Sequence, residues 1–194
     1  MELQAVALSV GNSAFLAFLL FGAGAFLAGM LFARLDSEPA AQVAISVCAY
    51  LKWFAVIILF SVFFIFLGHP AGLTVALWFG TVLGYFAAFF FSVSEILSKG
   101  GDFKPIAWYL LFGTFLLAGY VATSGAVIPW GTAMGKDVLL VLCLADLATL
   151  VGFLALRFAP RLIRPAGIIF MLVGIDCLYI VIRYVAASVG MGSF

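Results

Sequence analysis

The sequence predicts an all-α membrane protein with six transmembrane helices, and its composition and hydropathy are the observations that predict it. The chain has 194 residues, of which 67% are hydrophobic and only 9% are charged. Its mean hydropathy is +1.33. A soluble domain is usually about 45–50% apolar and about 25% charged. A water-soluble fold of this size could not bury so much apolar surface, so the excess is expected to face lipid.

Six apolar stretches are long enough to cross a bilayer, since a helix needs about 20 apolar residues to span the hydrocarbon core. The stretches are continuous rather than alternating, which disfavours a β-barrel. Between them lie short segments rich in Pro, Gly and charged residues, which end one helix and permit the reversal to the next. The predicted spans are 8–33, 43–67, 72–97, 106–129, 138–158 and 166–190.

The short loops leave no room for an extramembrane domain, so we expect a single transmembrane domain over 1–194. A faint internal similarity is also present, because the letters LLFG occur at 19–22 and again at 110–113. Three-helix halves in opposite orientation are common in transporters. The similarity therefore suggests a weak inverted repeat between 1–97 and 106–190.

Basic residues near the span ends predict the orientation, because cytoplasmic loops carry an excess of Lys and Arg. The side opposite to them carries Lys136, beside Asp137. Both termini are thus expected on the non-cytoplasmic side, and the expected location is a prokaryotic inner (plasma) membrane. The basic residues assigned to the cytoplasmic loops are Arg34, Lys99, Lys104, Arg157, Arg161 and Arg164.

Several functional classes are excluded or disfavoured. The net charge is +1 and the charges are scattered, so the chain offers no basic surface for nucleic acid. The cysteines Cys48, Cys143 and Cys177 form no CxxC pair, which disfavours a disulfide framework or a zinc site. The single histidine, His69, cannot supply a bis-histidine haem. With no catalytic motif in view, we expect neither a metal, a cofactor nor an enzymatic activity.

Three ionisable residues are predicted near the bilayer midplane. Lys52, Asp146 and Asp176 lie about 12–15 Å from one end of their predicted spans, in a hydrocarbon core about 30 Å thick. A charge at that depth costs about 2.5–3.5 kcal/mol on the insertion scale. Opposite charges at one depth predict that Lys52 faces Asp146, Asp176 or both.

Three interpretations of this cluster remain open. It could be a structural ion pair that fixes the helix register. Alternatively, two carboxylates that share one lysine leave a negative charge that can bind a proton or a cation, or meet Arg183. Arg183 lies two turns after Asp176 on the same helix face, although such a residue can also reach the interface as an anchor. A third possibility is a charge on a partner chain.

Polar neighbours accompany one of the aspartates. Cys143 and Thr149 lie three residues before and after Asp146, and we expect them to support it. Glu95, by contrast, is predicted to form a solvated pair with Lys99, one turn later, outside any site.

Two stripes of small residues predict close helix contacts. They are Gly22, Ala25 and Gly29 in the first span, and Gly119, Ala122 and Ala126 in the fourth. Their partner could be a helix of the same chain, a second copy or another subunit of a membrane complex. The lipid bilayer around the helices is a further expected partner.

These features predict a small transporter or channel, coupled to protons or cations through the midplane carboxylates. The alternative is a non-catalytic structural subunit of a larger membrane complex. A transporter needs a polar path to Asp146 or Asp176, whereas a structural subunit would bury both residues without access for water.

One segment resembles a known family. Asp102-Phe-Lys-Pro105, followed by Trp108-Tyr109 and Leu111-Phe112, is similar to the segment that enters the fourth helix of proton-gated urea and amide channels. The resemblance implies six spans with both termini outside. The tryptophan-rich pore helices and the pore glutamate of that family have no match in spans 5 and 6, so no site residue is carried over.

Overall fold

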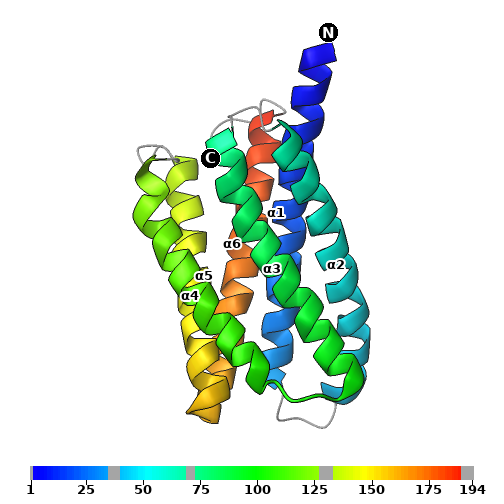
Figure 1. Cartoon of the computed structure of the whole chain (residues 1–194), viewed down its shortest axis with the longest axis vertical. Helices are drawn as coiled ribbons and strands as arrows, with labels where there is room; N and C mark the ends of the chain where they lie inside the picture. Colours follow the sequence, from blue (N-terminus) through cyan, green and yellow to red (C-terminus); the bar gives the residue numbers. More distant parts are fainter. Residues whose placement is uncertain (1, 35–39, 69–72, 127–132, 189–194) are drawn as a thin grey trace.

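The chain forms an all-helical bundle in a computed structural model (Figure 1). The structure describes residues 2–34, 40–68, 73–126 and 133–188. Each long helix there contains a stretch that is long and apolar enough to cross a membrane, which confirms the six predicted spans. The helices are α1 (Glu2–Arg34), α2 (Ala40–Gly68), α3 (Leu73–Lys99), α4 (Lys104–Thr123), α5 (Ala133–Arg157) and α6 (Ile163–Ser188), with the short 3₁₀ helices η1 (Ser124–Ala126) and η2 (Pro160–Leu162).

The connection between α3 and α4 shows how the local sequence sets the helix ends. Gly100 has a φ of 62°, the left-handed conformation that favours glycine after a helix. Asp102 Oδ1 then accepts a hydrogen bond of 2.9 Å from the backbone N–H of Lys104, at the start of α4. This hydrogen bond holds the pKa of the Asp102 carboxyl below its usual range. The turn thus ends one helix and caps the next.

The helices are arranged as a ring, and we call each contact between two neighbouring helices a seam. The seam between α3 and α4 is the loosest. Contacts are extensive between α1 and α2, α2 and α3, α4 and α5, α5 and α6, and α6 and α1, whereas the backbones of α3 and α4 come close at few positions. The first and last helices thus lie side by side, and α1 begins at the end of the bundle where α6 stops (Figure 1). The space enclosed by the ring is filled by buried phenylalanines, namely Phe21, Phe32, Phe86, Phe89, Phe90 and Phe170.

Glycines set the close approach of α1 and α6. A Cβ atom built on Gly29 would lie 2.5 Å from the backbone oxygen of Gly167, and one built on Gly174 would lie 2.5 Å from that of Gly22. Only glycine fits where two helix backbones touch in this way. The stripe of Gly22, Ala25 and Gly29 therefore packs against α6 of the same chain.

The second stripe has a different environment. A Cβ atom on Gly119 would meet nothing within 4 Å, and Ala122 is exposed. The surroundings of Ala126 lie outside the described residues. This part of α4 is left uncovered by the described part of the chain.

Two tyrosines form the centre of the seam between α3 and α4. The Tyr85 hydroxyl donates a hydrogen bond of 2.9 Å to the backbone oxygen of Tyr109, and the Tyr109 hydroxyl donates one of 2.7 Å to that of Tyr85. Their rings stack with centroids 4.7 Å apart. The pair thus binds each helix to the other in both directions.

We expect Tyr85→Phe to lower the free energy of unfolding by about 1 kcal/mol, because it removes one hydrogen bond at a largely buried position. Thermal unfolding in detergent, followed by circular dichroism, measures this change. Tyr120→Phe is the control, since the contact recorded for Tyr120 is an aromatic one to Trp78, with centroids 5.2 Å apart. An equal loss in both variants would contradict the role of the hydroxyl.

Candidate functional site

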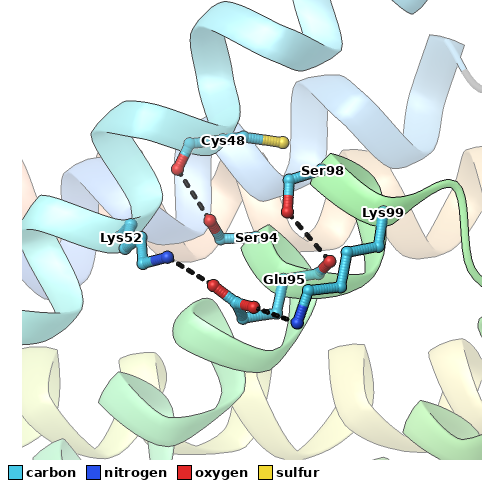
Figure 2. Close-up of polar contacts among 6 residues, drawn as sticks. All are labelled: Cys48, Lys52, Ser94, Glu95, Ser98 and Lys99. Carbon is cyan, nitrogen blue, oxygen red and sulfur yellow. Dashed lines mark hydrogen bonds and ion pairs between the residues drawn. The ribbon is translucent and has the colours of Figure 1, made fainter.

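The ionisable residues predicted to meet at the midplane lie in three different seams of the bundle. Lys52 projects from α2 toward α3 and forms an ion pair with Glu95 (Figure 2). Glu95 also pairs with Lys99, at 2.7 Å. The expected pairing of Lys52 with Asp146 or Asp176 is therefore wrong, because α2 packs against α1 and α3 and presents Lys52 to α3.

The ion pair draws the Lys52 side chain toward the end of α3. Its partner Glu95 lies four residues before the last residue of α3, which is about 6 Å along the helix axis. Lys52 itself lies twelve residues after the start of α2, about 18 Å along that helix. The predicted pair of Glu95 with Lys99 is present, and Glu95 in addition binds Lys52.

Arg183 forms an ion pair with Asp137 across the seam between α5 and α6. The distance between Arg183 Nη1 and Asp137 Oδ2 is 2.5 Å, and both side chains are mostly buried. Asp137 was assigned to a loop beside Lys136, whereas α5 already begins at Ala133. The earlier start of the helix places Asp137 one turn inside it, where it can reach α6.

The Asp137–Arg183 pair fixes the relative heights of the two aspartates. Asp146 lies nine residues further along α5, about 13 Å from Asp137. Asp176 lies seven residues before Arg183, about 10 Å back along α6. Because α5 and α6 run in opposite directions, both displacements point the same way. Asp146 and Asp176 thus lie on the same side of the Asp137–Arg183 pair along the bundle axis, at similar distances from it.

The two aspartates nevertheless face different seams. The nine residues from Asp137 to Asp146 make about two and a half turns, which puts these side chains on opposite sides of α5. Asp137 faces α6, so Asp146 lies on the side of α4. Thr149, one turn after Asp146, agrees with this placement, because its hydroxyl lies 3.1 Å from that of Thr114 in α4.

The two residues predicted to support Asp146 lie on different sides of α5. Thr149 is buried, and its hydroxyl donates a hydrogen bond of 2.8 Å to the backbone oxygen of Asp146. Cys143 is exposed on the outside of α5. Thr149 therefore packs inside the bundle beside Asp146, whereas Cys143 faces outward.

Each aspartate buries one carboxyl oxygen without a partner. Asp146 Oδ1 and Asp176 Oδ2 are inaccessible to solvent and have no hydrogen-bond partner among the described residues. A buried carboxylate that lacks donors is costly, so it favours the uptake of a proton or a cation. Within the described ranges, no three His, Cys, Asp or Glu side chains form a group that could hold a metal ion.

Comparison with known proteins finds no matching family, no similar curated protein and no similar solved structure. The resemblance of 102–112 to urea and amide channels therefore stays a local one. Any function for this chain has to be argued from the chemistry of its own residues.

Proposed function

We propose that this chain is a small membrane transport protein that takes up and releases protons at Asp146 and Asp176. The observation that carries the proposal is the buried, unpartnered carboxyl oxygen on each of these residues. Glu95 and Asp137 differ, because Glu95 has Lys52 and Lys99 and Asp137 has Arg183. Asp146 and Asp176 each keep one buried carboxyl oxygen to which no described residue donates a hydrogen bond.

Protonation of either aspartate would change the packing of α5 against a neighbouring helix. Asp146 lies on α5 at its seam with α4, and Asp176 lies on α6 at its seam with α5. Loss of a proton from either residue places a negative charge in a low-dielectric seam and disfavours tight packing there. The backbones of α3 and α4 come close at few positions, so we propose that the pair of α4 and α5 is the part that shifts.

The orientation that we propose follows the positive-inside rule. Lys99 and Lys104 flank the connection between α3 and α4, and Arg157 and Arg161 flank the connection between α5 and α6. We assign this end of the bundle to the cytoplasm and both termini to the outside, in a prokaryotic inner membrane.

The first test is proton flux in reconstituted vesicles. We expect the double variant Asp146→Asn, Asp176→Asn to lose at least about nine-tenths of the flux driven by an imposed potassium-diffusion potential, because an amide does not bind and release protons in this range. A pH-sensitive dye inside the vesicles reports the flux. Asp102→Asn, which changes an exposed acid in a connection between helices, is the control and should keep the rate of the unmodified protein.

Unchanged flux in the double variant, at equal protein content and helicity, would contradict the proposal. Circular dichroism accompanies each preparation, because a variant that loses flux and helix content together has lost its fold and does not test the role of the carboxyls. Carbodiimide labelling gives a second readout, because a carbodiimide adds the O–H of a protonated carboxyl across its C=N bond. Labelling of the unmodified protein at neither aspartate would also count against the proposal.

A structural subunit of a larger membrane complex is the second candidate. The observation that favours it is the uncovered face of α4 around Gly119 and Ala122, where a neighbouring helix could approach closely. Gly119→Leu would then release the chain from its complex during mild detergent extraction. The transport proposal predicts that the same variant keeps its flux as an isolated chain.

A further inference from the structure

The lysines that converge on Glu95 form a compact cationic site where the end of α3 packs against the first half of α2. Figure 2 shows Lys52 and Lys99 reaching the same carboxylate from opposite sides, Lys52 from α2 and Lys99 from the end of α3. Each Glu95 oxygen is engaged by a different lysine. The three formal charges leave the group with one net positive charge.

A hydrogen bond from α3 to the backbone of α2, in addition to the ion pair, fixes the position of Lys52. The hydroxyl of Ser94 is buried and donates a hydrogen bond of 2.9 Å to the backbone oxygen of Cys48. Lys52 lies one turn after Cys48, and Glu95 directly follows Ser94 (Figure 2). The contact between Ser94 and Cys48 thus sets the register that brings Lys52 opposite Glu95.

Both lysines remain open on their outer side. The exposed fraction is 48% for the Lys52 side chain and 73% for Lys99, against 26% for Glu95. An ammonium group has three N–H donors, and each lysine directs one toward Glu95. The remaining donors lie on the outside of the bundle, where the surroundings of a membrane span are lipid.

Exposed aromatic side chains beside this site are of the kind found where a span meets the lipid headgroups. Tyr50 and Trp53 are exposed on α2 within one turn of Lys52, and exposed Tyr and Trp are typical of the membrane interface. Lys52 Nζ lies 5.3 Å from the centre of the Phe91 ring, which is itself partly exposed one turn deeper than Glu95. A lipid acyl chain could lie along Phe91 while its headgroup meets the two lysines.

We infer that Lys52, Glu95 and Lys99 form a binding site for the phosphodiester of an anionic phospholipid. A phosphodiester with an uncharged alcohol carries one negative charge, which matches the one net positive charge of the site. Its oxygens accept hydrogen bonds from the outer N–H donors of both lysines. Glu95 spaces the lysines and limits the attraction, so a zwitterionic lipid gains little there.

The test uses the purified full-length chain in detergent, with lipid binding followed by native mass spectrometry. The unmodified protein should retain phosphatidylglycerol at least about five-fold more tightly than phosphatidylcholine. The double variant Lys52→Met, Lys99→Met should lose this preference. Lys104→Met is the matched control, because Lys104 lies at the start of α4 outside the site and pairs with Asp102.

Glu95→Gln gives the sharpest result, because it changes binding in the opposite direction. It removes the competing carboxylate and leaves both lysines free, so retention of phosphatidylglycerol should rise by roughly five-fold even if the bundle melts earlier. A role of the three residues in packing alone predicts no such gain.

Three results would overturn the inference. One is equal retention of the two lipids by the unmodified protein, and another is retention of phosphatidylglycerol by the double lysine variant at the unmodified level. The third is displacement of the lipid by millimolar inorganic phosphate, which would make the ligand a soluble anion. None of these outcomes depends on proton flux, so this site and the transport proposal can fail separately.

Discussion

Gly29→Ala is expected to destabilise the bundle by about 3 kcal/mol, the upper part of the range for overpacking of a tight interior. The added methyl group would lie 2.5 Å from the backbone oxygen of Gly167 and 2.7 Å from the backbone nitrogen of Met171. Backbone atoms in a helix cannot move aside as a flexible side chain can. Helices α1 and α6 would have to separate along their contact, and thermal unfolding in detergent would show the loss.

Gly84→Ala and Gly119→Ala are the matched controls for this prediction. Both glycines lie inside helices, and a Cβ atom on either would meet nothing within 4 Å. These variants should melt at or slightly above the temperature of the unmodified protein, since alanine reduces the entropy of the unfolded chain. If Gly29→Ala melted together with the controls, the close approach of α1 and α6 would not be what holds the first and last helices together.

The number and type of the helices could be predicted from the sequence because the bilayer imposes both. A spanning segment must satisfy its own backbone hydrogen bonds and match the thickness of the hydrocarbon core. The stripe of Gly22, Ala25 and Gly29 was also visible as a helix contact. Which helix it meets could not be deduced, although Gly167 and Gly174 in α6 repeat the same seven-residue spacing.

The partners of the charged residues could not be predicted for a geometric reason. Counting residues gives the height of a side chain relative to one helix end, but not the direction in which it points. Helix α2 is apolar on all sides, so its sequence holds no periodicity that would reveal the rotation of Lys52. The ion pair with Glu95 draws the Lys52 ammonium toward the end of α3, a direction that counting residues along α2 does not give.

Arg183→Met is expected to lower the free energy of unfolding by about 2 kcal/mol. Removal of one partner from a buried ion pair costs about 3–5 kcal/mol, and we reduce this value because the Arg183 and Asp137 side chains are 21% and 23% exposed. The substitution leaves Asp137 without its cation in the seam between α5 and α6. Thermal unfolding in detergent at neutral pH measures the effect.

Lys52→Met provides the contrast, because Glu95 keeps Lys99 as a partner and the Lys52 side chain is half-exposed. Its cost should stay below about 1 kcal/mol, as for ion pairs at surfaces. The double variant Asp137→Asn, Arg183→Met should regain most of the stability lost in Arg183→Met, since the stranded carboxylate is replaced by a neutral amide. If the double variant were as unstable as Arg183→Met alone, the loss would come from packing of the arginine stem instead of from an uncompensated charge. Recovery would identify the Asp137–Arg183 pair as the contact that neutralises this end of the seam.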